Sequence, residues 1–203
     1  MPGGGGAIAN NYFTSEVKGD GLTIMASGVS TIESFTRGGA TVKYDPRRYK
    51  YIGGVARGGS VLMVRKQARP RVTDRNTPKV VVGDTDGIRT WVPVTIWGAE
   101  YLDWNLRWIY GYQGGSELAI ALRQGELDIW GTQSAKLIND LVRDGVVDLW
   151  CQQDEKRRAD FPNVPTFLEM LGAKRPSGVP WQAYLAWSGS NSFTSRSLRR
   201  TTW

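Results

Sequence analysis

The feature that most constrains this chain is a regular alternation of short apolar runs and helix-like segments between residues 79 and 151. The four apolar runs are rich in β-branched and aromatic residues and predict strands: KVVVG (79–83), LRWIYGY (106–112), ELDIWG (126–131) and VVDLWC (146–151). Three segments with apolar residues at helical spacing separate them: 87–103, 116–125 and 134–145. Because strand–helix–strand units pair their strands in parallel through right-handed crossovers, this half predicts an α/β lobe with a mostly parallel sheet.

Residues that commonly begin and end helices support these boundaries. Ser116 and Ser134 are suitable N-caps, and Gly125 and Gly145 suit the positions just after a helix. Pro93 is compatible with the first of the three helices only in its first turn.

The remaining sequence is more broken. We expect helices in 6–17 and 30–39, a turn and strand in 20–27, and two glycine-separated strands in 49–66. The polar stretch 67–78 contains proline and suits a segment that crosses between lobes. Thr166 and Glu169 have capping-box spacing before another short helix, whereas residues 188–203 lack periodicity and predict a disordered or poorly packed segment.

Composition excludes several functions. The chain has 203 residues, a net charge of +7, one cysteine and no histidine. A disulfide framework, a multi-cysteine metal site and histidine-dependent nucleophilic catalysis are therefore excluded, and we expect no metal or cofactor. The basic residues are scattered rather than aligned on one helix or sheet face, so a small anionic ligand fits the charge better than nucleic acid.

The turns that follow three of the predicted strands share glycines with hydroxyl, amide or carboxylate side chains. They are Gly83-Asp84-Thr85-Asp86, then Gly111-Tyr112-Gln113-Gly114-Gly115-Ser116, then Gly131-Thr132-Gln133-Ser134. In a parallel sheet such turns lie at one edge, where backbone N–H groups at helix N-termini favour an anion. They therefore predict a carboxylate or phosphate site, although helix capping alone is an alternative explanation of the same residues.

An enzyme is a second hypothesis, and it needs an acid or base at this edge. The candidates are Asp84, Asp86, Glu117 and Asp128, the last of which forms a same-face pair with Glu126. Cys151 ends an apolar strand with no base beside it, so a buried and inert thiol is the better interpretation.

Several segments resemble the receptor components of tripartite tricarboxylate transporters, the extracytoplasmic solute receptors known as the Bug family. The similarity extends over roughly residues 1–172. The segments that carry it, in the family's order, are MPGGGGAIANNYF, GDGLTIMAS, VKYDPRRYKYIGGVAR, GYQGGSELAIALRQGELDIWGTQSA and FPNVPTFLEMLG.

The resemblance implies a two-lobed, venus-flytrap binding protein of α/β lobes (type II periplasmic-binding-protein-like), not an enzyme. Residues 1–66 and 152–203 would form a partial first lobe and 67–151 the second. The implied ligand is a small organic acid, either a di- or tricarboxylate or an aromatic carboxylate. It would be delivered to a membrane permease from the periplasm. By position, the implied ligand-binding residues are Ser27, Gly28, Gly83, Asp84, Thr85, Tyr112, Gln113, Gly114, Gly115, Ser116, Gly131 and Thr132.

The chain departs from the family at both ends. Family members begin earlier, with a signal peptide and a first strand, and continue beyond the helix near residue 170 to complete the first lobe. We therefore expect a receptor that is truncated at both ends, with an incomplete first lobe. A nonfunctional receptor fragment remains an alternative.

Overall fold

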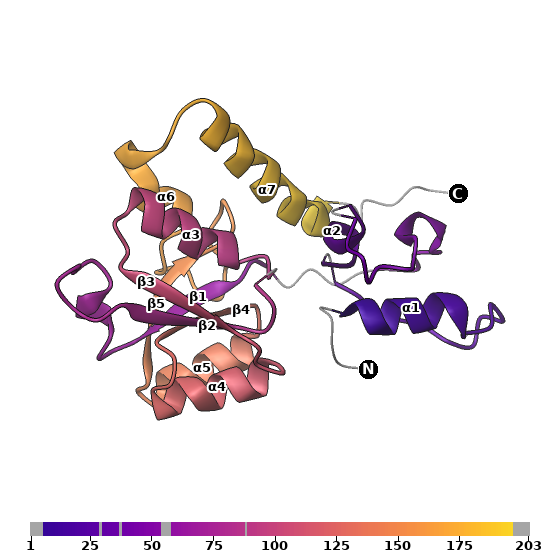
Figure 1. Cartoon of the computed structure of the whole chain (residues 1–203), viewed down its shortest axis with the longest axis horizontal. Helices are drawn as coiled ribbons and strands as arrows, with labels where there is room; N and C mark the ends of the chain where they lie inside the picture. Colours follow the sequence, from indigo (N-terminus) through magenta and orange to yellow (C-terminus); the bar gives the residue numbers. More distant parts are fainter. Residues whose placement is uncertain (1–5, 29, 37, 54–57, 88, 197–203) are drawn as a thin grey trace. The chain divides into compact units, whose positions relative to one another are not determined.

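The computed structural model describes residues 6–28, 30–36, 38–53, 58–87 and 89–196, with the backbone alone for residues 30, 33 and 189–196. The chain divides into two compact units, residues 1–54 and 55–203, and each unit is described by itself (Figure 1). The predicted division into lobes, with residues 1–66 and 152–203 in the first and 67–151 in the second, stays a prediction.

The first unit contains the helices α1 (Ala7–Ser15) and α2 (Ser30–Thr36) and the short 3-10 helix η2 (Pro46–Arg48). Two buried side chains connect them. Tyr44 donates its hydroxyl to the carbonyl of Thr31 at 2.9 Å, and Asn10 donates its amide to the Thr31 hydroxyl at 3.3 Å. The expected helices are therefore confirmed in this unit, whose small interior is held together largely by polar contacts.

The second unit is built on one five-stranded sheet in the order β3-β2-β4-β1-β5. The strands are β1 (Val61–Arg65), β2 (Val80–Asp84), β3 (Leu106–Tyr110), β4 (Ile129–Thr132) and β5 (Val147–Gln152). The strand β2 pairs in parallel with β3 and β4, whereas β1 pairs antiparallel with β4 and β5. All four strands of the predicted alternation are present.

The prediction of a mostly parallel sheet is wrong in its pairing, because two of the four strand pairs are antiparallel. The strands β2 to β5 do run in one direction. The difference arises because β1, which precedes the alternating series, lies between β4 and β5. It runs in the opposite direction and pairs with both of them. The sheet is therefore mixed.

Helices cover both faces of this sheet (Figure 1). On one face lie α4 (Gly115–Gln124) and α5 (Ala135–Arg143); on the other lie α3 (Val92–Tyr101) and α6 (Phe167–Leu171). The last helix, α7 (Val179–Arg196), packs its first half against α3 and α6 through aromatic rings. The Tyr184 ring stacks 4.5 Å from that of Trp97, and Phe167 lies 6.3 Å from the same tyrosine. The unit therefore has three layers around one apolar core.

The helix boundaries follow the capping residues closely. Ser134 accepts the N–H of Leu137 at the start of α5, and Thr166 with Glu169 forms the predicted capping box on α6. Gly125 ends α4 with a φ of 83°, in the left-handed region that favours glycine. Ser116, however, is not an N-cap, because α4 begins one residue before it and Gly114 takes the cap position.

Three local predictions are wrong. Residues 20–27 form no strand, although Asp20 makes the expected turn by accepting the N–H of Leu22 at 3.0 Å. Residues 49–53 form no strand either, so only the second of the two expected in 49–66 is present, as β1. Part of the segment expected to be disordered, residues 188–196, belongs to α7, and residues 197–203 lie outside the described chain. A strand needs a hydrogen-bonding neighbour, which the described part of the first unit does not provide.

None of the helices in the described part of the chain has both the length and the apolar character required to cross a bilayer.

Candidate anion-binding edge

Five strand ends meet at one edge of the sheet in the second unit. The carboxyl ends of β2, β3, β4 and β5 lie there with the start of β1, because Val61 is opposite both Thr132 and Gln152, and Asp84 is opposite Tyr110. We call this the strand-end edge: residues 58–60, 84–87, 110–116, 132–134 and 152–158. Ten of the twelve predicted ligand residues lie on or beside it: Gly83, Asp84, Thr85, Tyr112, Gln113, Gly114, Gly115, Ser116, Gly131 and Thr132.

The other two, Ser27 and Gly28, belong to the first unit. Both lie just before α2, where the Gly28 carbonyl accepts the N–H of Thr31 at 3.1 Å. The Ser27 hydroxyl forms hydrogen bonds with Thr31 and Asn10. Their predicted role in binding stays a prediction.

The turn after β2 is closed by its own side chains. The buried Asp84 carboxylate accepts the N–H of Gly87 at 3.0 Å, and the Thr85 hydroxyl accepts Nε of Arg89 at 3.1 Å. Burial is the main cause that raises the pKa of the Asp84 carboxyl, while hydrogen bonds from Thr85 and Gly87 oppose that shift. This turn therefore uses the Asp84 carboxylate and the Gly87 N–H internally.

Two glycines at this edge are required by packing. A Cβ at Gly83 would lie 2.4 Å from Cδ2 of Leu127, and one at Gly131 would lie 2.6 Å from Cδ2 of Trp91. Both positions are buried, and both contacts are too close for any side chain. Their small size is thus explained by the core, without reference to a ligand.

The turn between β4 and α5 is also satisfied internally. The Ser134 hydroxyl accepts the N–H of Leu137 at 3.4 Å, and the Thr132 hydroxyl accepts the N–H of Ser134 at 3.2 Å. These side chains hold the first turn of α5. They accept hydrogen bonds from two N–H groups of the turn that the sequence predicted to bind a ligand.

The start of α4 differs from the other two turns. Gly114 has no side chain to cap the helix, and the first N–H bonded within it is that of Leu118, which donates to the Gly114 carbonyl at 3.1 Å. The N–H groups of Gly115, Ser116 and Glu117 therefore have no intrahelical acceptor. With the helix dipole behind them, they form the best-suited anion-binding group at this edge.

Two side chains border these donors. The Glu117 carboxylate accepts the N–H of Gln113 and adds a negative charge to the first turn. Gly115 lies against the α5 side of the sheet, since a Cβ there would be 3.4 Å from Cζ2 of Trp130 and 3.7 Å from Cδ1 of Leu137. The α4 N-terminus and the first turn of α5 are therefore neighbours.

The acidic residues offered by the enzyme hypothesis are dispersed or already bonded. Asp128 precedes β4 and lies at the opposite edge, where its carboxylate accepts the N–H of Val81 at 3.1 Å and pairs with Arg71 at 3.2 Å. Asp84 and Glu117 accept backbone N–H groups, as described above. Cys151 is fully buried, and burial raises its thiol pKa far above the usual range.

Sequence patterning missed a second group of residues at this edge. Gly59 donates its N–H to Asp154 at 2.5 Å, and the Thr90 hydroxyl donates to the buried Gln153 at 3.2 Å. Arg158 donates to the carbonyls of Gly59 and Gln133. The signal in the sequence is weak, because the glycines before β1 resemble an ordinary turn and Arg158 is one of many scattered basic residues. Their proximity depends on β1 lying between β4 and β5.

Comparisons with known proteins give structural similarity but no sequence match. No family model matches the chain, and no curated protein matches it. A solved structure described as a periplasmic transporter aligns over 98% of this chain and 71% of its own, with a TM-score of 0.67 and 15% identity. The fold of the chain therefore resembles part of that of a periplasmic binding protein. This agrees with the resemblance found in the sequence.

Two further solved structures are similar to the chain. The periplasmic binding protein BugD aligns over 96% of this chain and 70% of its own, with a TM-score of 0.52 and 18% identity. MatC from Rhodopseudomonas palustris, solved with bound malate, aligns over 71% of this chain and 53% of its own, with a TM-score of 0.45 and 18% identity.

Proposed function

We propose that this chain is a solute receptor that binds the carboxylate of a small organic acid at the strand-end edge of its second unit. The observation that carries the proposal is the uncapped N-terminus of α4, where Gly115, Ser116 and Glu117 offer N–H groups without intrahelical acceptors. A carboxylate placed there accepts hydrogen bonds from N–H groups that have no acceptor within the helix, and it also meets the positive end of the helix dipole.

The fold supports a binding protein over an enzyme. The similar structures are described as a periplasmic transporter and a periplasmic binding protein. Three of the carboxylates at the edge already accept backbone hydrogen bonds: Asp84 from Gly87, Glu117 from Gln113 and Asp154 from Gly59. A general base needs to reach a substrate proton, and these groups are engaged in holding turns.

The finer parts of the proposal follow the sequence resemblance. The receptor would act in the periplasm and deliver a di- or tricarboxylate, or an aromatic carboxylate, to a membrane permease. The roles that the resemblance implies for Ser27 and Gly28 in ligand binding stay predictions. The matched segment GYQGGSELAIALRQGELDIWGTQSA contains the α4 N-terminus and Ser134, the N-cap of α5.

Binding is tested by thermal unfolding with acetate, succinate, citrate and benzoate, with succinamide as the uncharged control. A ligand present at about 100 times its dissociation constant stabilises the folded state by about 2.7 kcal/mol. We expect at least one carboxylate to raise the midpoint and succinamide to leave it unchanged. If no acid does so at millimolar concentration, the proposal is wrong.

A matched pair of variants tests the α4 N-terminus itself. Proline at the first helical position removes one N–H while it preserves the helix, and Gly114 already has the extended backbone that a residue before proline prefers. Gly115→Pro should therefore weaken carboxylate binding about tenfold, whereas Gly115→Ala, which keeps the N–H, should not. Equal affinity of the two variants would place the anion elsewhere.

A further inference from the structure

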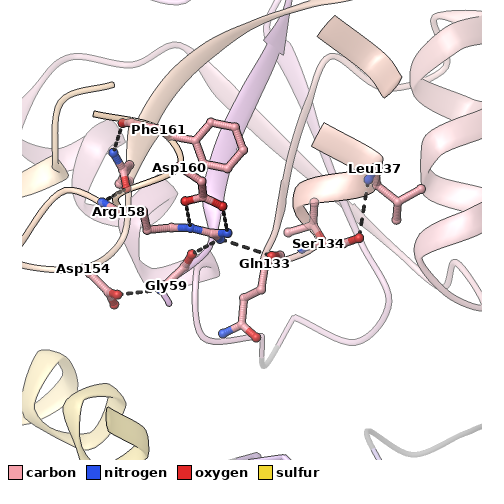
Figure 2. Close-up of polar contacts among 10 residues, drawn as sticks. Gly59, Gln133, Ser134, Leu137, Asp154, Arg158, Asp160 and Phe161 are labelled. Atoms are coloured by element: carbon pink, nitrogen blue, oxygen red, sulfur yellow. Dashed lines mark hydrogen bonds and ion pairs between the residues drawn. The ribbon is translucent and has the colours of Figure 1, made fainter. Parts of the chain in front are cut away.

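Arg158 lies at the centre of a polar cluster on the strand-end edge (Figure 2). Its side chain is only 8% exposed. The guanidinium donates from Nε and Nη2 to the two carboxylate oxygens of Asp160 at 2.9 and 2.6 Å. Nη1 donates to the carbonyls of Gly59 at 2.9 Å and Gln133 at 3.1 Å. Four of its N–H groups are thus used within the protein.

The two carbonyls that Arg158 contacts belong to different parts of the chain. Gly59 precedes β1, and Gln133 follows β4, which pairs with β1. A second contact fixes the same place, because the Gly59 N–H donates to Asp154 just after β5. A Cβ at Gly59 would lie 2.3 Å from Oδ1 of Asp154, so this contact requires glycine. Three adjacent strand ends are fastened together at this position.

The cluster connects to the α4 N-terminus through α5. Gln133 is followed directly by Ser134, whose hydroxyl caps Leu137, and the side chain of Leu137 lies beside Gly115. Figure 2 shows Arg158, Gln133, Ser134 and Leu137 in this succession. A shift of the Gln133 turn would therefore change the space next to the N–H groups of α4.

We propose that Arg158 is a positioning residue for the anion site: it fixes the β4–α5 turn against the start of β1 and so sets the position of the first turn of α5 beside the α4 N-terminus. Its role in affinity rests on the proposed function. Arg158 does not act as the ligand's cation, because its charge is paired with Asp160 and its directed donors hold protein carbonyls. It acts through the backbone that it holds.

The chain provides a closely matched control. Arg157 is the adjacent residue and also pairs with a carboxylate, Glu169, at 2.9 Å while donating to the carbonyl of Pro162. Its side chain is 41% exposed, and its partners lie away from β1 and β4. Arg157→Gln therefore removes the same charge and a similar set of hydrogen bonds without releasing the Gln133 turn.

The first measurement requires no ligand. Amide hydrogen exchange of the full chain is compared for wild type, Arg158→Gln, Arg158→Lys and Arg157→Gln. We expect Arg158→Gln to speed exchange at Gln133–Leu137 and Gly59–Val61 about tenfold. The closed turn loses a charge-assisted hydrogen bond in this variant, so less free energy is needed to open it. Arg158→Lys keeps the charge but not the fork of donors and should fall between wild type and glutamine. Arg157→Gln should match wild type there. If exchange in Arg158→Gln is unchanged at these amides, the positioning role is wrong.

The second measurement separates positioning from general stability. The dissociation constant for the carboxylate that stabilises wild type most, of the four named above, is measured at a temperature where every variant is folded. Arg158→Gln should bind about tenfold more weakly, while Arg157→Gln and Asp128→Asn, which destabilises the opposite edge, should bind as wild type does. Arg158→Lys should recover part of the loss.

The outcomes of the two measurements are distinguishable. If Asp128→Asn weakens binding as much as Arg158→Gln, the effect is one of stability and the positioning role is overturned. If wild type binds none of the acids, the proposed function fails and the affinity role with it. Hydrogen exchange still decides in that case whether Arg158 fixes the turn.

Discussion

The Glu117 carboxylate accepts a hydrogen bond from the backbone N–H of Gln113 and so places a negative charge in the first turn of α4. That charge interacts favourably with the helix dipole in the absence of ligand. It also lies next to the N–H groups of Gly115 and Ser116, which the proposed carboxylate would use. Glu117 thus holds the turn that precedes α4 and adds a negative charge that repels the proposed anion.

We predict that Glu117→Gln tightens carboxylate binding two- to fivefold, roughly the factor that corresponds to one exposed like-charge contact near a helix end. Glutamine keeps an oxygen that accepts the Gln113 N–H while it removes the charge. Titration calorimetry at low and high salt provides the measurement, and the gain should shrink at high salt. Glu100→Gln, near the C-terminal end of α3, is the control for total charge and should leave affinity unchanged. Weaker binding by Glu117→Gln would indicate that this carboxylate orders the turn for the ligand.

We predict that Gly98→Ala destabilises the second unit by about 2–3 kcal/mol. A Cβ at Gly98 would lie 2.0 Å from Cε3 of the buried Trp104, so either α3 or the ring has to move. Gly114→Ala is the control, because nothing lies within 4 Å of a Cβ there and its φ of 169° is extended. It should change the free energy of unfolding by less than about 0.5 kcal/mol. Urea unfolding measures both, and equal values for the two variants would contradict the packing account.

The raised pKa of Asp84 gives a pH dependence with a defined sign. A carboxyl whose pKa is higher in the folded than in the unfolded state stabilises the fold most below the unfolded value, near 3.9, and that contribution is lost as the pH rises through the folded pKa. We therefore predict that the stability of Asp84→Asn relative to wild type increases between about pH 3.5 and pH 7. Urea midpoints across this range test it, and a difference that falls with pH would show that the hydrogen bonds from Thr85 and Gly87 outweigh burial.

Asp128→Asn should lower the free energy of unfolding by about 2 kcal/mol, because Arg65 and Arg71 lose their shared and largely buried counter-ion. Carboxylate affinity should stay unchanged, since Asp128 lies at the edge opposite the proposed site. Chemical denaturation and calorimetry of the same preparation give both quantities. Turnover of one of the acids by wild type that is lost in Asp128→Asn would revive the enzyme hypothesis, in which Asp128 is an acid–base candidate.

Cys151 should be inert in the folded protein. Its side chain has no exposed surface, and burial raises the thiol pKa, so very little thiolate is present at neutral pH. We expect a chromogenic disulfide reagent to label no thiol in native buffer and one per chain in urea. Rapid labelling of the native protein would show that β5 opens locally.

The sequence predicted the second unit well because its signals are local. Apolar runs marked β2 to β5, and single capping residues such as Ser134, Thr166 and Gly125 set helix ends that the structure confirms. The wrong predictions of a strand in residues 20–27 and of an N-cap at Ser116 share one cause. Residues 20–27 have strand-like composition, and Ser116 is a good cap by type, but pairing and the exact helix start depend on neighbours in space.

The sequence by itself determined that this chain alternates strands and helices, lacks histidine-based chemistry and places polar turns after its strands. Only the tertiary structure decided that β1 enters between β4 and β5 in the opposite direction, which brings Gly59 and Gln133 within reach of one guanidinium. It also decided which helix start lacks a side-chain cap, because Asp84 and Ser134 accept hydrogen bonds within their own turns and Gly114 has no side chain to do so. Whether a donor is free depends on contacts between residues distant in sequence, and these form only when the chain folds.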